Sequence, residues 1–419
     1  MGGEWRQYDV SALINDGILL IGDGYRAKND ELAPSGLPFA RAGNINNGFQ
    51  FDDADHFPDA NVSRVTNKIS QPGDVVFTSK GTVGRFAFVR SRTPRFVYSP
   101  QLCFWRSLNT GVIESHFLYF WMYGREFFVQ FKGVAGQTDM AEYVSLSDQR
   151  RMRITLPPIY EQRTIAHILG TLDDKIELNR KMSETLEAMA RTLFKSWFVD
   201  FDPVRAKAAG EKPPGLADDI AALFPDRFVE SELGEIPEGW SDGRLSDLVE
   251  LKYGKALKAT ERCDGKVPVY GSGGITGWHD EALVEHPTVI VGRKGSVGTL
   301  YWEDRPSYPI DTTFFVTTKT APLTFCYYAM LGLGLEVLNT DAAVPGLNRD
   351  NAYRQTIVIP PPDMLAAWDS FAGVLRENLR LLRDENDVLT QLRDLLLPRL
   401  ISGKLRVSEA EEAIAEVMM

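Results

Sequence analysis

The sequence of 419 residues lacks the features that mark membrane, secreted and metal-binding proteins. It has no run of about 18 apolar residues, and we expect no membrane span. The N-terminal stretch has no apolar signal core, and the three cysteines, Cys103, Cys263 and Cys326, are scattered. This use of cysteine is typical of a reducing compartment, so we expect a cytoplasmic protein. The five histidines lack metal-ligand spacing, and we expect no metal site.

Catalytic motifs are missing as well. An adenine methyltransferase needs Asn or Asp before Pro-Pro-aromatic, which LPPIY (156–160) and IPPPD (359–363) do not provide. The segment GRKGSVG (292–298) does not have the spacing of a phosphate-binding loop, and no Ser or Cys nucleophile motif is found. We therefore assign no catalytic residue. A stand-alone methyltransferase or nuclease with drifted motifs stays an alternative.

An excess of basic charge is the third missing feature. The net charge is −11, which taken alone argues against a nucleic-acid-binding protein. Acidic residues concentrate in 201–239 and in the C-terminal segment, whereas the other parts of the chain are close to neutral. If the chain binds DNA, its phosphate contacts are local, or a partner supplies much of the positive charge.

An internal repeat is the most informative feature that is present. The paired segments are Lys80–Gly84 with Lys294–Gly298, 37–45 with 267–275, and 156–158 with 359–361. They keep one order along the chain, and two copies are too few for a solenoid. We therefore predict two similar domains related by a pseudo-two-fold axis. Such symmetry suits a two-part target such as DNA with two half-sites.

Two long stretches predict amphipathic helices that pair with each other. Apolar residues recur every seven positions in both, with Asn179 in the middle slot of the first. Repeats of this length predict an antiparallel helix pair, in which Asn179 either fixes the register or faces solvent. The predicted seam residues are Ile165, Leu172, Leu186, Leu193, Trp368, Leu375, Leu382, Leu389 and Leu396.

We predict an α+β protein, with two mixed α/β domains separated by two long antiparallel helices. Short β-rich runs between glycines and prolines indicate the sheets of each domain. The predicted segments are a first domain at 1–158, a central helix at 159–200, an acidic connector at 201–239, a second domain at 240–361, a distal helix at 362–407 and a short acidic helical tail at 408–419.

The repeated Lys-Gly-Thr/Ser-Val-Gly segments are the main candidates for a binding site. Each predicts a tight turn that brings backbone amides, a cation and a hydroxyl to one edge, where lysine reaches phosphate or guanine. An ordinary glycine-rich hairpin with a solvated lysine is the alternative. The candidate DNA-binding residues are Ser79, Lys80, Gly81, Thr82, Arg293, Lys294, Gly295 and Ser296, with Asn44, Gly273, Gly274, Asn348 and Arg349.

These features together resemble the specificity subunit of a type I restriction–modification system over nearly the whole chain. The resemblance rests on the order domain–helix–domain–helix and on five segments, at 156–181, 193–210, 233–240, 344–362 and 395–407. Two departures stand out. The second junction reads PPPDMLAAW in place of a Glu-Gln pair, and QTDMAEYVSLSD (137–148) replaces the VPGLNRD element in the first domain.

The resemblance implies a non-catalytic protein that reads a bipartite sequence in double-stranded DNA, one half per domain. It also implies two methyltransferase subunits docked on the central helices and restriction subunits that complete the complex. S-adenosylmethionine, ATP and Mg would belong to those partners, with no cofactor in this chain and no membrane contact. A DNA-free tandem scaffold is a further alternative.

Overall fold

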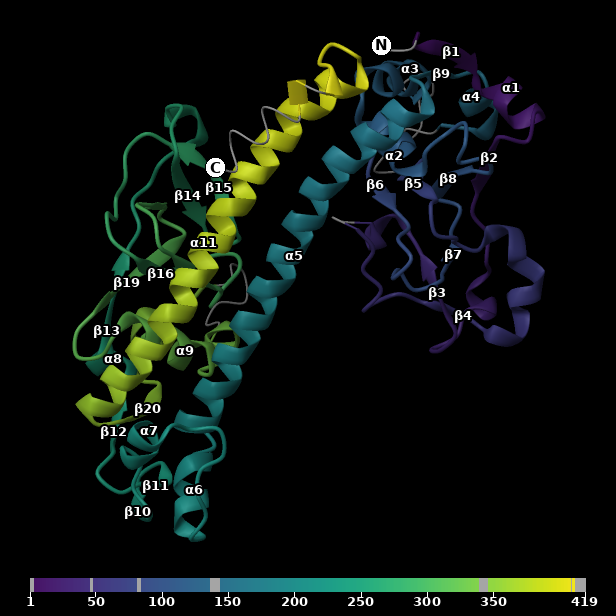
Figure 1. Ribbon diagram of the computed structural model, residues 1–419. Helices are drawn as coiled ribbons and strands as arrows, with labels where there is room; N and C mark the ends of the chain where they lie inside the picture. Colours follow the sequence, from purple (N-terminus) through teal and green to yellow (C-terminus); the bar gives the residue numbers. More distant parts are fainter. Residues whose placement is uncertain are drawn as a thin grey trace. The chain divides into compact units, whose positions relative to one another are not determined.

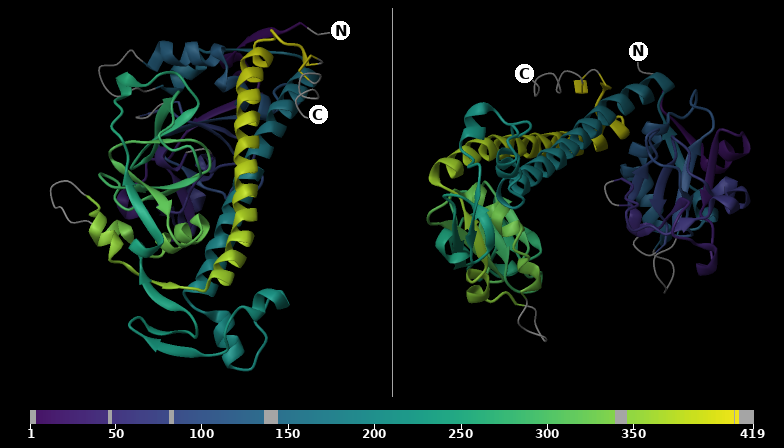
Figure 2. Two further views of the ribbon diagram at one scale, coloured as in Figure 1. Left: turned by 90° about the vertical axis from the view of Figure 1, so that its left-hand side faces the viewer. Right: turned by 90° about the horizontal axis from the view of Figure 1, so that it is seen from below.

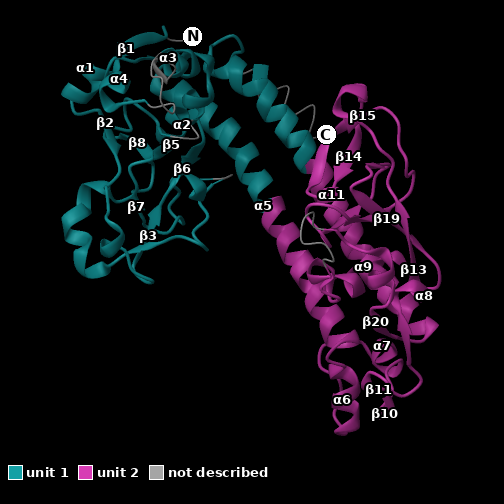
Figure 3. Ribbon diagram, turned by 180° about the vertical axis from the view of Figure 1, so that it is seen from behind, with its two compact units in different colours: residues 1–178, 386–419 teal, residues 179–385 magenta. Residues whose placement is uncertain are grey.

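The chain folds into two compact units, which a computed structural model describes at residues 4–45, 48–80, 84–135, 144–338, 346–407 and 409–410. Unit 1 comprises residues 1–178 and 386–419, and unit 2 comprises residues 179–385 (Figure 3). The boundary falls inside both long helices, α5 (Ile159–Phe198) and α11 (Pro362–Ile401). This grouping differs from the predicted segments, because each part of a helix packs into the core of the domain that it contacts. No helix of the described residues is long and apolar enough to span a bilayer.

Unit 1 is built on two sheets. The larger has the strand order β2-β8-β5-β6, the smaller has the order β4-β3-β7, and β1 pairs with β9. The strands are β1 Arg6–Asp9, β2 Leu19–Asp23, β3 Leu37–Ala40, β4 His56–Phe57, β5 Val75–Thr78, β6 Phe86–Phe88, β7 Val97–Tyr98, β8 Leu102–Ser107 and β9 Arg153–Leu156. The helices are α1 Val10–Asn15, α2 Ser115–Tyr123, α3 Arg125–Ala135, α4 Leu146–Arg150, the first part of α5 and the last part of α11.

Unit 2 repeats this plan. Its sheets have the orders β13-β19-β16-β17 and β15-β14-β18, and β12 pairs with β20. The strands are β10 Phe228–Ser231, β11 Gly234–Pro237, β12 Ser241–Arg244, β13 Val249–Tyr253, β14 Val267–Gly271, β15 Gly274–His279, β16 Thr288–Gly292, β17 Leu300–Glu303, β18 Tyr308–Pro309, β19 Thr313–Thr318 and β20 Thr356–Ile359. The helices are α6 Asp202–Ala208, α7 Asp218–Ala222, α8 Leu245–Leu248, α9 Leu323–Leu331 and α10 Arg349–Tyr353, together with the last part of α5 and the first part of α11.

The two sheet systems correspond strand by strand. Strand β3 runs parallel to β7 in unit 1, and β14 runs parallel to β18 in unit 2. The larger sheets are antiparallel in both units. The predicted α+β class with two repeated domains is therefore confirmed.

The acidic connector is part of the core of unit 2. It forms α6, α7 and the β10–β11 hairpin, and it buries Phe201, Val204 and Phe224. The Trp240 ring lies 5.7 Å from the ring of Phe201 and 5.8 Å from that of Phe198 at the end of α5. These apolar contacts hold the connector against α5, which precedes it in the chain, and against the second domain, which follows it.

Helices α5 and α11 lie side by side and antiparallel in unit 2 (Figures 1 and 2). Asn179 on α5 donates to Glu385 on α11 at 2.7 Å. Further along α5, Glu187 accepts from Arg376 at 2.6 Å, and Arg376 comes earlier in α11 than Glu385, so the two helices run in opposite directions. In unit 1 the same two helices are joined by an ion pair between Asp173 and Arg393 at 3.0 Å. The predicted antiparallel pair is thus observed within each unit.

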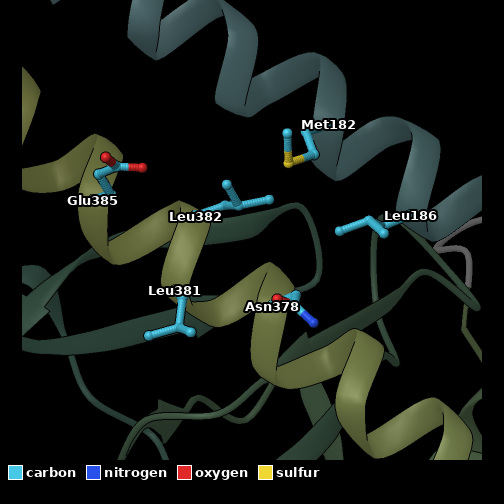
Figure 4. A pocket seen from close by; sticks show the side chains of 6 residues that line it. All are labelled: Met182, Leu186, Asn378, Leu381, Leu382 and Glu385. Carbon is cyan, nitrogen blue, oxygen red and sulfur yellow. The ribbon is translucent and has the colours of Figure 1, made fainter.

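Six of the nine predicted seam residues are buried, and three are only half-buried. Ile165, Leu172, Trp368, Leu375, Leu389 and Leu396 are buried, whereas Leu186, Leu193 and Leu382 are only half-buried. Leu382 points toward Met182 and Leu186 across a hollow of ≈ 500 Å³ in unit 2 (Figure 4). Asn179 is 0% exposed, so the alternative in which it faces solvent is wrong. Most of the predicted acidic tail, residues 408 and 411–419, lies outside the described residues.

Candidate DNA interface

A hollow of ≈ 300 Å³ in unit 2 gathers four of the predicted DNA-binding residues, Arg293, Lys294, Asn348 and Arg349. We call it the arginine hollow. Its lining comes from the end of β13, the segment after β16, the start of β19 and the start of α10. The lining residues are Tyr253, Arg293, Lys294, Phe314, Gly346, Leu347, Asn348, Arg349 and Asp350.

Arg293 is held in place by its own backbone and by its side chain. Its amide donates to the carbonyl of Thr312 at 2.9 Å, and its Nε donates to the carbonyl of Asp311 at 3.1 Å. The guanidinium carbon lies 5.2 Å from the centre of the Tyr253 ring, within the range of a cation–π contact. Lys294, the next residue, is exposed, and its backbone amide also donates to Thr312 at 3.1 Å.

Arg349 approaches the same tyrosine from α10. Its guanidinium carbon is 5.2 Å from the ring centre of Tyr253 and 5.8 Å from that of Tyr353. Its Nε is buried and has no hydrogen-bond partner among the described residues. Asn348 has a different role, because its side-chain oxygen accepts from the amides of Asp350 at 2.8 Å and of Asn351 at 3.3 Å and caps the helix.

Two glycine-containing loops of unit 2, the lysine loop at 294–298 and the glycine loop at 271–274, lie against each other beside this hollow. Gly274 and Gly295 have φ values of 105° and 85°, a backbone region that favours glycine. A Cβ on Gly295 would lie 3.2 Å from Oγ of Ser272, and one on Gly273 would lie 3.9 Å from Oγ of Ser296. Gly273, Gly274, Gly295 and Ser296 therefore shape the loops and are not part of the lining of the hollow.

Unit 1 presents the corresponding surface with different side chains. Ser79 is 1% exposed, so its side chain lies behind the surface and is not retained as a DNA contact, whereas Lys80 is exposed. Asn44 is engaged within its own loop, because its side chain accepts from the Arg41 amide at 2.8 Å and donates to the Gln50 carbonyl at 2.9 Å. Gly81 and Thr82 lie outside the described residues.

The backbone frame around the two lysine loops is the same in both units. The amide of Ser79 donates to Gln101 at 2.9 Å, and its carbonyl accepts from Val144 at 3.1 Å. In unit 2 the amide of Arg293 donates to Thr312 at 2.9 Å, and its carbonyl accepts from Leu347 at 2.8 Å. Each lysine loop is thus fixed between the start of a central strand and the segment before a short helix.

In each unit a side-chain hydrogen bond also joins the segment after the lysine loop to the glycine loop, which is the segment at 271–274 in unit 2 and at 41–44 in unit 1. Thr299 donates through Oγ1 to the carbonyl of Ser272 at 2.6 Å, and Arg85, its counterpart in the repeat, donates to the carbonyl of Ala42 at 3.3 Å. The sequence hypothesis did not include Thr299 or Arg85. The signal was present, because both directly follow the second glycine of the repeated motif.

The side chains on this common frame differ. Tyr253 ends β13 opposite Phe314, and its counterpart Asp23 ends β2 opposite Cys103. Asp23 forms an ion pair with Lys68 at 2.5 Å. The structural counterparts of Asn348 and Arg349 are Ser145, which also caps its helix, and Leu146. Most of the rest of the segment that replaces VPGLNRD in the first domain, at 137–143, lies outside the described residues, as do 344 and 345.

One group of potential metal ligands occurs in the described part of the chain. Cys263, His279 and Asp280 offer ligand atoms within 4.8 Å of one another. Nδ1 of His279 already accepts from the backbone amide of Cys263 at 3.0 Å, so this nitrogen is engaged in the fold. The expectation that the chain holds no metal stays a prediction.

Comparisons with known proteins identify the family. Residues 16–188 and 237–363 match the type I restriction modification DNA specificity domain. The chain is 25% identical over 404 residues to the type I restriction enzyme HindI specificity subunit of Haemophilus influenzae, covering 81% of this chain and 88% of that protein. It is 24% identical over 376 residues to the MjaIX specificity subunit of Methanocaldococcus jannaschii, covering 83% and 81%.

A solved structure shares the fold. The crystal structure of the type I restriction–modification S subunit from M. genitalium superposes with a TM-score of 0.60 at 17% identity, over 95% of this chain and 96% of that one. Because the family match covers most of the chain, the chain belongs to the type I restriction–modification DNA specificity family. The resemblance seen in the sequence is confirmed, and the chain is a specificity subunit.

Proposed function

We propose that this chain is the non-catalytic subunit that reads a bipartite DNA sequence and directs partner methyltransferase and nuclease subunits to it. The observation that carries the proposal is the common backbone frame of the two units with different side chains on it. One scaffold used twice suits two half-sites, and different side chains suit two different base sequences. In this proposal S-adenosylmethionine, ATP and Mg bind to the partners, and this chain holds no cofactor.

Selection from a random duplex library tests the function directly. The full chain, alone and with a methyltransferase subunit, should enrich a motif with two specified halves and an unspecified spacer between them. A library that emerges without any sequence preference would contradict the proposal and favour the DNA-free scaffold. Binding of S-adenosylmethionine to the purified chain alone would favour the stand-alone methyltransferase instead.

The two exposed loop lysines should contribute phosphate contacts. Lys294→Ala and Lys80→Ala are each expected to weaken binding of the selected duplex and to reduce the slope of log K against log salt by about one. Lys266→Ala is the matched control, because this lysine is exposed but precedes β14, at the end away from the glycine loop. If both variants bind like the wild type across a salt series, the loops are only turns.

An apolar surface on the helices supports docking of the partner. In unit 2, Met182, Met189, Val374 and Leu381 are 45–61% exposed, and Met182 and Leu381 line the hollow of ≈ 500 Å³. In unit 1, Leu178, Val388 and Leu395 are likewise exposed. The four α11 residues Val374, Leu381, Val388 and Leu395 lie seven positions apart, which is the spacing of a stripe that pairs with another helix.

We expect Leu381→Asp to reduce co-purification of the methyltransferase subunit without lowering the melting temperature by more than a degree or two. Leu381 is 51% exposed, so a charge there costs little folding free energy but is unfavourable in an apolar interface. Val337→Asp is the control, because Val337 is 77% exposed and lies outside the helix pair. Equal recovery of the partner with both variants would argue against this docking surface.

A further inference from the structure

We propose that the arginine hollow of unit 2 reads a guanine, with the Arg349 guanidinium donating to O6 and N7 and the Asp350 carboxylate accepting from the paired cytosine. This inference rests on the proposed function and identifies one base of the recognised sequence. It also separates the two halves of the target, because Tyr253, Arg293 and Arg349, which line this hollow in unit 2, have different counterparts in unit 1.

The first argument is the state of Arg349. Its guanidinium lies between two tyrosine rings, at 5.2 Å from Tyr253 and 5.8 Å from Tyr353, which restricts its orientation. Its Nε is buried without a hydrogen-bond partner among the described residues, and no ion pair joins Arg349 to a carboxylate there. Nη1 and Nη2 donate to no group among the described residues, and this planar pair of donors matches the two acceptors on the major-groove edge of guanine.

The neighbouring cations complete the site without competing for the same role. Arg293 lies on the same Tyr253 ring, but its Nε is used by the Asp311 carbonyl at 3.1 Å. Lys294 is exposed beside it, and its flexible stem suits a phosphate of the backbone. Arg293 and Lys294 therefore position the DNA, and Arg349 is left to discriminate the base.

A phosphate is the competing ligand for such a cluster, and Asp350 argues against it. Asp350 lines the hollow next to Arg349. A carboxylate repels a phosphate, whereas it accepts a hydrogen bond from the amino group of cytosine. An arginine and a carboxylate side by side thus fit the edge of a G·C pair better than they fit the DNA backbone.

The corresponding place in unit 1 keeps the loop lysine, Lys80, but its described residues lack counterparts of the tyrosine and the two arginines. Asp23 occupies the position of Tyr253, Ser79 that of Arg293, and Leu146 that of Arg349. Leu146 is partly buried against the core of unit 1, and Asp23 is paired with Lys68. Loss of Arg349 should therefore change one half of the recognised sequence and leave the other half as it is.

The test is selection from the random duplex library with the full chain and its methyltransferase partner, for wild type, Arg349→Ala and Arg349→Lys. The wild type should select a guanine at one position of one half-site. Arg349→Ala should lose that preference by roughly 10- to 100-fold, because a good bidentate contact contributes ~1–3 kcal/mol of discrimination. Arg349→Lys, which keeps the charge but not the planar fork, should lose the preference while retaining affinity for non-specific DNA.

Arg354→Ala is the matched control, because this exposed arginine caps the other end of α10. It should leave the motif unchanged, and a thermal melt of each variant checks folding. A uniform loss of affinity with the guanine retained would assign Arg349 to a phosphate and overturn the inference. An unchanged motif in Arg349→Ala would also overturn it. A wild-type library without any motif would overturn the proposed function itself.

Discussion

Trp368→Ala is expected to lower the free energy of unfolding of unit 2 by about 3–5 kcal/mol, the largest effect of any single change considered. Trp368 is 0% exposed in the first turns of α11. Its ring lies 5.3 Å from that of Phe194, 5.5 Å from Phe198 and 5.9 Å from Trp197, all on α5. Truncation would leave a cavity among rigid rings, which collapse poorly around it.

A chemical denaturation series would measure this loss, and hydrogen exchange would locate it. The loss of amide protection should concentrate in residues 179–385, which make up unit 2. Trp368→Phe should cost less than Trp368→Ala, because it keeps an aromatic ring and removes an indole Nε1 that has no partner among the described residues. Val374→Ala is the control on the same helix, and with 61% exposure it should stay within ~0.5 kcal/mol.

A melting curve of Trp368→Ala close to that of the wild type would contradict the observed pairing of α5 with α11 in unit 2. The half-buried Leu382 provides an internal comparison on the same helix. Because Leu382 borders a hollow of ≈ 500 Å³, Leu382→Ala should cost less than Trp368→Ala. The heptad pattern alone would have ranked the two positions together.

The second large effect is expected for Arg376→Ala, at about 3 kcal/mol. The Arg376 guanidinium is surrounded by the rings of Trp302 at 4.8 Å, Tyr327 at 4.6 Å and Tyr328 at 5.1 Å. It also donates to Glu187 at 2.6 Å and thereby joins α11 to α5. Removal of the cation leaves the carboxylate of Glu187 in a partly buried place and opens the aromatic cage.

The predicted loss for Arg376→Ala lies at the lower end of the range for a broken buried pair, because Glu187 keeps a second partner, Arg191, at 2.9 Å. A double-mutant cycle with Glu187→Ala would measure the coupling, expected at about 1–3 kcal/mol. Arg380→Ala is the control, since its ion pairs with Glu377 and Asp384 are largely exposed and are worth ~0–1 kcal/mol. Equal stability losses for Arg376→Ala and Arg380→Ala would show that the cage does not stabilise unit 2.

Much of the architecture follows from patterns within short stretches of the sequence. The heptads predicted α5 and α11, because a helix places every third or fourth side chain on one face whatever lies elsewhere in the chain. The two Lys-Gly-Thr/Ser-Val-Gly segments predicted the repeat, because turns of the same type need glycine at the same positions. These are local properties of the backbone, and the structure agrees with them.

The composition of the binding site depends on contacts between distant segments. Tyr253, Arg293 and Arg349 come from three elements. The pairing of β13 and β16 with β19 and the bond between Leu347 and Arg293 bring them together. Contacts with distant segments also bury Ser79, which the motif placed at the DNA, because Gln101 and Val144 bond to its backbone. A motif states which side chains adjoin in sequence, but not which of them the fold covers.

The sequence by itself determined the two-domain repeat, the two paired helices and the family of this protein. The tertiary structure alone decided that the connector belongs to the core of unit 2, that the helix seam loosens at Leu382 and that Arg349 lies on Tyr253. Periodicity reports which face of an element is apolar. Burial and site geometry instead depend on which elements meet that face, and strand pairing and side-chain packing over long sequence separations decide this.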